Sequence, residues 1–312
     1  MTQFMDRLIA AINQCENPTV MGLDPNLDYI PPQLVQEVVA EIADPQDRAA
    51  EMMFRFNRGL LEAVRGVIPA VKPQLAYYEM YGVPGLAAFT RTCTLAQELG
   101  YIVIADGKRN DIGTTASAYA SAYLGEIEYP CGRRQRSFDT DALTVNPYLG
   151  SDGILPFLEL AAPQGRGAFA LLRTSNPSAS DLQDLQLADG RKLYEATADL
   201  LDAWGEAYIG TEGYSALGAV VGATWPEQAA KLRKEHPRLF FLVPGYGAQG
   251  GDASSVRPNF DKDGQGAIIN ASRSLMTAWM MSGGEGEDYQ EATLREARTM
   301  RDSIRAALAR RH

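Results

Sequence analysis

The sequence predicts an α/β fold: a single (β/α)8 (TIM) barrel over residues 1–312, with extra N-terminal and loop segments. Three observations support this prediction. Eight short apolar runs of the β type recur along the chain, and helical patterns separate most of them without a break between domains. With 312 residues, of which 46% are hydrophobic, the chain has enough apolar material for one large core.

The predicted strands are apolar nearly throughout, as parallel strands are when both faces of their sheet are covered. They are expected at residues 20–23, 67–71, 101–105, 142–145, 168–172, 216–221, 239–243 and 267–269. A doubly wound open sheet is the alternative. We favour the barrel because the eight strand–helix alternations match the eight strands that a barrel needs. The sequence also contains no P-loop motif that would support an open sheet.

Helical patterns occupy most of the intervals between the strands. They are expected at residues 48–64, 84–99, 154–160, 192–207, 225–235, 274–281 and 287–310. Two segments exceed a minimal barrel, and the sequence leaves their conformation open. Residues 24–47 form a long connection after the first strand. Residues 125–141 carry the basic residues Arg133, Arg134 and Arg136. This basic cluster is either part of a solvated loop surface or a ligand-binding site.

Charge and hydropathy exclude several partners. The formal charge of −10 argues against binding nucleic acid or an anionic membrane, so an anionic ligand would need a local basic site. No run reaches the roughly 18 apolar residues of a membrane span. The amphipathic N-terminal segment lacks a secretory core, and the chain is therefore expected to be cytoplasmic.

Cysteines and histidines give no catalytic or metal pattern. Cys15, Cys93 and Cys131 are not in C-x-x-C spacing, which fits a reducing compartment and predicts no metal site. His236 ends a charged helix and His312 is the last residue, so histidine-dependent triads and zinc sites are excluded. Proton chemistry would belong to Lys, Asp, Glu or Tyr.

The most informative stretch is residues 104–115, where the third strand turns into a helix that starts near Ile112. Asp106 and Lys108 are two positions apart, hence on one side of an extended chain, and Asp111 follows at the turn. A simpler interpretation makes Asp111 a helix cap and Asp106–Lys108 a surface ion pair worth under about 1 kcal/mol.

Polar residues follow most of the strands, where barrels of this type place their active sites. These strand-end residues are Asp24, Lys72, Asp106, Lys108, Asn146, Arg173, Thr174, Ser175, Pro244, Ser272 and Arg273. Singly, residues such as Asp24 before Pro25 are ordinary turn openers. Together with Asp111 at the turn after the third strand, two lysines and three carboxylates are expected at one mouth. Because burying unpaired charge is costly, we interpret them as functional.

A glycine-rich segment, residues 244–252, follows the seventh strand and exposes backbone N–H groups. Ser272 and Arg273 follow the eighth strand and open a helix. These loops form the phosphate site common in such barrels, and Arg273 offers a planar fork to a phosphate. A flexible loop and a capping pair are the alternative. The combination predicts a phosphorylated small substrate whose far end lies against the charged stretch.

The sequence resembles the orotidine 5′-monophosphate decarboxylase family, in particular its longer bacterial members. The anchors of the resemblance are Val71-Lys72-Pro73-Gln74, Asp106-Gly107-Lys108-Arg109-Asn110-Asp111-Ile112-Gly113, residues 244–251 and Ser272-Arg273. The resemblance implies release of CO2 from orotidine 5′-monophosphate to give UMP, the last step of pyrimidine nucleotide synthesis, with no metal or organic cofactor.

The resemblance also implies roles for individual residues. Lys108 would protonate C6 after CO2 leaves, within a network of Lys72, Asp106 and Asp111. Asp111 and Thr115 would reach across a homodimer interface into the neighbouring site. Asp24 and Lys72 would contact the ribose, and Ser175 (with Thr174 as the alternative) would contact the pyrimidine. Gln249, Ser272 and Arg273 would surround the phosphate, and Pro244 would line the pocket.

Two other functions stay open. An aldolase or metal-assisted sugar-phosphate decarboxylase could use Lys72 or Lys108 as a Schiff base, although close pairing with carboxylates favours a charged ammonium. A nucleotide-binding protein without chemistry would be free to lose Asp106, Lys108 or Asp111, and all three are present.

Overall fold

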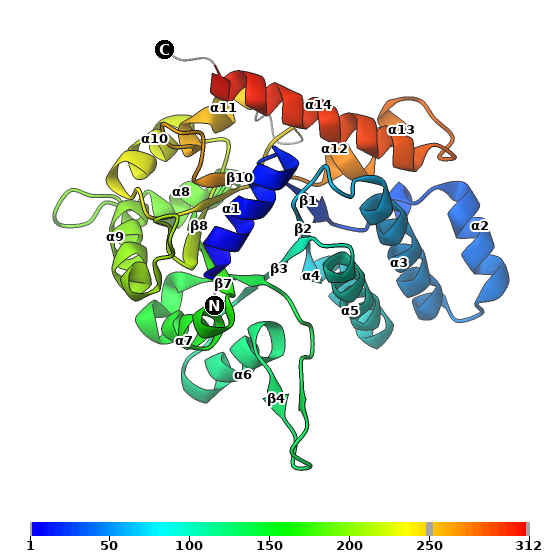
Figure 1. Cartoon of the computed structure of the whole chain (residues 1–312), viewed down its shortest axis with the longest axis horizontal. Helices are drawn as coiled ribbons and strands as arrows, with labels where there is room; N and C mark the ends of the chain where they lie inside the picture. Colours follow the sequence, from blue (N-terminus) through cyan, green and yellow to red (C-terminus); the bar gives the residue numbers. More distant parts are fainter. Residues whose placement is uncertain (1, 248–251, 310–312) are drawn as a thin grey trace.

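The computed structural model describes residues 2–247 and 252–309 (Figure 1). Eight parallel strands close into a barrel in the order β1, β2, β3, β6, β7, β8, β9, β10 and back to β1. Their bounds are β1 Thr19–Leu23, β2 Ala70–Pro73, β3 Ile102–Arg109, β6 Ala142–Val145, β7 Gly167–Arg173, β8 Leu217–Val221, β9 Phe241–Val243 and β10 Ala267–Ala271. The predicted (β/α)8 barrel is confirmed.

Helices surround the barrel, and they include the predicted ones together with shorter or additional helices that the sequence did not predict. They are α1 Phe4–Cys15, α2 Pro32–Glu41, α3 Pro45–Ala63, α4 Leu75–Glu79, α5 Gly82–Glu98, α6 Gly113–Leu124, α7 Leu155–Ala161, α8 Ser180–Gln183, α9 Leu193–Gly205, α10 Pro226–Glu235, α11 Ala253–Val256, α12 Arg273–Met276, α13 Ala278–Met281 and α14 Tyr289–Ala309. Among the helices that were not predicted are α2, α4, α8 and α11. None of these described helices combines the length and the apolar character needed to cross a bilayer.

Several predicted boundaries differ from the structure, and three of them have a clear local reason. The predicted strand 67–71 starts later because Val67 and Ile68 still belong to the turn after α3, where both amides donate to the carbonyl of Val64. The third strand runs through its polar end to Arg109. The predicted helix 274–281 is divided into α12 and α13 at Thr277, whose hydroxyl bonds back to the carbonyl of Arg273 at 2.8 Å.

The strands bury side chains on both faces, which explains their continuous apolar runs. In β1, Val20 belongs to the core inside the barrel, whereas Met21 belongs to the core between barrel and helices. Helix α1 covers the N-terminal ends of the strands, where Phe4 packs edge-on against Phe169 with 5.9 Å between ring centroids. A functional site is therefore expected at the opposite, C-terminal ends.

The two long segments also have defined structure. Residues 24–47 contain a 3-10 turn, Leu27–Tyr29, then α2 and the start of α3. Residues 125–141 form an arm that projects from the barrel, in which the short strands β4, Ile127–Glu128, and β5, Arg134–Gln135, pair in antiparallel register (Figure 1).

Candidate active site

A cavity of about 540 Å³ opens at the C-terminal ends of the strands. It brings together predicted residues from the C-terminal ends of β1, β2, β3, β7, β9 and β10 and from the loops that follow these strands. These residues are Asp24, Lys72, Asp106, Lys108, Ser175, Pro244, Ser272 and Arg273. The closure of the barrel thus gathers side chains that are up to about 250 positions apart in sequence.

Asp106 is the centre of the charged network in this cavity. Its Oδ2 accepts from Lys72 Nζ at 2.6 Å and from Gln74 Nε2 at 3.0 Å. Its Oδ1 accepts from Lys108 Nζ at 2.6 Å and from the hydroxyl of Thr144 at 2.9 Å. Four donors therefore hold one buried carboxylate in place.

The network keeps these groups ionised. Burial alone would raise the pKa of Asp106, but the ammonium groups of Lys72 and Lys108 outweigh it and hold that pKa well below its usual range. Burial alone would lower the pKa of Lys72, but the carboxylates of Asp106 and Asp24 raise it above its ordinary value. Asp106 and Lys72 are consequently a fixed ion pair at neutral pH.

The two lysines differ in access. The Lys72 side chain is 6% exposed, whereas that of Lys108 is 46% exposed, and both residues line the cavity. Lys108 also has a left-handed backbone with φ of 47°, which costs a non-glycine residue of the order of 1–3 kcal/mol. The predicted meeting of Asp106 and Lys108 therefore occurs through an irregular backbone and not through simple strand alternation.

Asp24 lies beside this network with one oxygen unused. Burial raises the pKa of Asp24, and the nearby Lys72 ammonium opposes the rise. Its Oδ1 is buried and has no hydrogen-bond partner among the described residues. An unpartnered buried acceptor at a cavity wall fits a hydroxyl donor on a bound ligand.

The wall beside Asp24 is formed by residues from the ends of β10, which pairs with β1, and of β9. Ser272 approaches closely because β1 has Gly22 there; a Cβ on that residue would lie 1.8 Å from the Ser272 hydroxyl oxygen. Gly245 and Gly247 have φ of 100° and 74°, conformations that glycine adopts without strain. Arg273 lines the same wall, and Gln249 lies outside the described residues.

The loop after β7 gives different tasks to Thr174 and Ser175. The Thr174 hydroxyl donates to Asn176 at 2.6 Å and accepts from Gln183 at 2.8 Å, so it is used within the loop. The Ser175 hydroxyl has no hydrogen-bond partner within the described part of the chain and lines the cavity. Its backbone fits closely over Gly222, where a Cβ would lie 2.8 Å from the Ser175 Cα.

Arg173, the strand-end residue before this loop, points away from the cavity. It is fully buried, stacks 4.1 Å from the ring centroid of Trp225 and pairs with Asp184 at 3.0 Å. Its role is to support the loop from below.

Asp111 and Thr115 do not line this chain's cavity, although they lie just after β3 at the same end of the barrel. Thr115 is exposed on α6, and Asp111 Oδ1 accepts from the amide of Ile112 at 2.8 Å. The structure does not support the helix-cap interpretation of Asp111, because the N-cap position of α6 is Ile112 and no side chain caps it.

Sequence reasoning gave no role to Gln74 and Thr144, which both bond Asp106. Gln74 is the last residue of Val71-Lys72-Pro73-Gln74, one of the motifs that carry the family resemblance. Thr144 left a weaker signal, a polar residue within the otherwise apolar run of β6.

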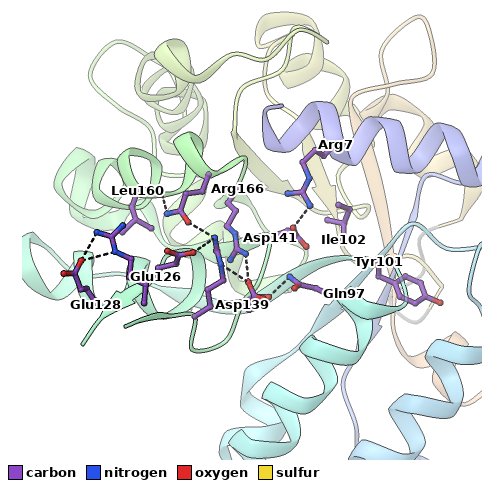
Figure 2. Close-up of a pocket in the computed structure, with 14 residues that line it drawn as sticks. Arg7, Gln97, Tyr101, Ile102, Glu126, Glu128, Asp139, Asp141, Leu160 and Arg166 are labelled. Carbon is purple, nitrogen blue, oxygen red and sulfur yellow. Dashed lines mark hydrogen bonds and ion pairs between the residues drawn. The ribbon is translucent and has the colours of Figure 1, made fainter. Parts of the chain in front are cut away.

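A second cavity, of about 950 Å³, lies at the N-terminal ends of the strands beside the arm (Figure 2). None of the predicted catalytic or substrate-binding residues lines this second cavity. The charged side chains that do line it form ion pairs with one another. The pairs are Arg7–Asp141 at 2.7 Å, Arg134–Glu128 at 2.8 Å, Arg136–Glu126 at 3.3 Å and Arg166–Asp139. Arg134 and Arg136 thus behave as the solvated, ion-paired loop surface.

Within the described ranges, no group of three or more His, Cys, Asp or Glu side chains is placed to hold a metal ion.

Residues 55–279 match the family described as "Orotidine 5'-phosphate decarboxylase / HUMPS family". The chain is 40% identical to orotidine 5′-phosphate decarboxylase of Rhodopirellula baltica, over 98% of this chain and 97% of that protein. It is 37% identical to the same enzyme of Caldicellulosiruptor bescii, over 99% and 100%. The solved OMP decarboxylase of Leishmania donovani is 29% identical, with a TM-score of 0.73 and full coverage of both chains.

Proposed function

The chain belongs to the orotidine 5′-phosphate decarboxylase / HUMPS family, and we propose how its site converts orotidine 5′-monophosphate to UMP and CO2. This reaction is the last step of de novo pyrimidine nucleotide synthesis. The observation that carries the proposal is the ion pair between Lys108 and Asp106, whose charged atoms are 2.6 Å apart in the lining of the cavity. Lys108 is the general acid of the reaction.

When the bond between C6 and the carboxylate breaks, CO2 leaves and the electron pair stays on C6. The ring delocalises this charge poorly, so a fixed ammonium nearby stabilises it without reorganising solvent. Lys108 then donates its proton to C6 and regains one from water. Asp106 keeps the ammonium in place, and Lys72 offsets the charge of Asp106 from its other side.

The remaining cavity residues bind the nucleotide. Asp24 accepts from a ribose hydroxyl, for which its buried Oδ1 is free, and Lys72 lies beside it. The free Ser175 hydroxyl contacts the pyrimidine amide edge, and Pro244 lines the pocket. Arg273, Ser272 and Gln249 hold the phosphate.

A second copy of the chain completes the site. Asp111 and Thr115 are absent from the cavity lining of their own chain, yet lie at the same end of the barrel. Large exposed apolar side chains follow β2, β3 and β6 at that end, as expected for a surface covered in an assembly. They are Met80, Val83, Ile112, Tyr148 and Leu149. We place Asp111 of the partner subunit beside Lys108 in a homodimer. One domain over residues 1–312 and a cytoplasmic location stay predictions.

The reaction is expected to need no metal. Purified protein in EDTA should change the ultraviolet absorbance of orotidine 5′-monophosphate in step with UMP formation. Activity that EDTA removes and Mg²⁺ restores would contradict the metal-free reaction. If the folded protein leaves this nucleotide unchanged, sugar phosphates with and without Mg²⁺ are the next substrates to test. A Schiff base with a sugar phosphate at Lys72 is disfavoured, because the raised pKa of Lys72 keeps its amine protonated.

Arg273→Ala is expected to lower kcat/KM for orotidine 5′-monophosphate by about 10- to 100-fold, because hydrogen bonds between charged groups contribute about 1.5–3 kcal/mol. The rate with orotidine, which lacks the phosphate, should hardly change. Steady-state kinetics with both substrates measures the difference. Equal losses with both would show that Arg273 acts on the fold of the loop and not on the phosphate.

A further inference from the structure

We propose that Thr144 is a positioning residue that sets the place of the Lys108 ammonium. The inference rests on the proposed role of Lys108 as the acid. Thr144 lies on β6, next to β3, and is 1% exposed. Its hydroxyl makes two bonds in opposite senses, one to each member of the Asp106–Lys108 pair.

The hydroxyl donates its proton to Asp106 Oδ1 at 2.9 Å and accepts from the backbone N–H of Lys108 at 2.9 Å. The same Asp106 oxygen accepts from Lys108 Nζ at 2.6 Å. These three contacts form a closed loop from the Lys108 backbone through Thr144 and Asp106 to the Lys108 side chain. The position of the ammonium is thereby coupled to one hydroxyl.

The local backbone explains why this coupling is needed. Pairing between β3 and β6 shifts register between Ala105 and Arg109, so the amide of Lys108 has no regular ladder partner there. Lys108 also has the left-handed φ of 47°, which a lysine does not favour. The Thr144 hydroxyl satisfies this amide and holds the irregular turn of the strand.

A substitution of Thr144 affects only one of the two carboxylate oxygens of Asp106, because the hydroxyl bonds Oδ1 and not Oδ2. Oδ2 is bonded by Lys72 and Gln74, and these contacts persist without the Thr144 hydroxyl. Within the described residues, Asp24 and Arg273, which are proposed to bind ribose and phosphate, make no hydrogen bond with Thr144. Loss of the hydroxyl should therefore disturb the acid and leave nucleotide binding intact.

The test compares Thr144→Val with Thr144→Ser in the full-length protein. Thr144→Val should lower kcat by about 10- to 100-fold, because small misplacements of a catalytic group have effects of this size, with KM and UMP affinity changed less than about threefold. Thr144→Ser, which keeps the hydroxyl, should retain most of the activity. If the valine variant does not fold, Thr144→Ala replaces it with the same expectation.

Thr140→Val is the matched control. Thr140 is also buried just before β6, but its hydroxyl donates to the Tyr123 carbonyl at 3.0 Å, far from the cavity mouth. This variant should lower the melting temperature without lowering kcat. Thr144→Val with unchanged kcat, or kcat losses alike in the valine and serine variants, would overturn the proposal. Lys108→Ala in parallel keeps the two claims apart, because an active Lys108→Ala would instead reject the role of the lysine.

Discussion

Lys108→Ala is expected to lower kcat for orotidine 5′-monophosphate by at least about 10⁴-fold, since it removes both a proton donor and a fixed positive charge. UMP affinity should survive, because the other cavity residues stay in place. The protein should also fold, since the Lys108 side chain is 46% exposed and Asp106 keeps Lys72, Gln74 and Thr144 as partners.

Single-turnover kinetics, UMP titration and thermal unfolding measure these three quantities. Lys231→Ala is a matched control, because Lys231 is similarly exposed at 48% and is also ion-paired, with Glu195 on α9. It should leave kcat unchanged. A Lys108→Ala protein that loses UMP affinity as much as kcat would assign Lys108 to binding, and one that is unfolded would make it structural.

The sequence was sufficient to predict the barrel because its strands are buried on both faces, a pattern that local composition records directly. The ends of strands were harder to predict where polar residues continue a strand beyond its apolar run. Strand β3 continues through Asp106 and Lys108, since β-pairing with β6 resumes at Arg109 after a register shift. A polar strand end of this kind looks like a loop in sequence.

The candidate site was predictable where it depended on residue type at strand ends. Lys72 lies at the C-terminal end of β2, and Asp106 and Lys108 lie at that of the neighbouring strand β3, so their meeting follows from topology. The bonds from Thr144 were not predictable, because they depend on the left-handed turn at Lys108, which no local pattern encodes. The proposed place of Asp111 beside the Lys108 of a partner subunit was not predictable from residue patterns either, because one sequence does not state how two copies meet.

Mixing Lys108→Ala with Asp111→Ala is expected to restore activity that neither variant has alone. If Asp111 serves the neighbouring site, a mixed dimer has one site that lacks both residues and one that lacks neither. Random exchange makes about half of the dimers mixed, and each of them restores one of its two sites. The mixture should therefore reach about one quarter of the wild-type activity.

The control mixes Lys108→Ala with the double variant Lys108→Ala/Asp111→Ala, which contains no intact site in any combination and should stay inactive. Subunit exchange is verified with differently tagged chains before the assay. If Asp111 acted within its own subunit, every site of a mixed dimer would lack one of the two residues, and exchange would restore nothing. Recovery therefore tests whether the Asp111 carboxylate, which does not line the cavity of its own chain, serves the site of the neighbouring subunit.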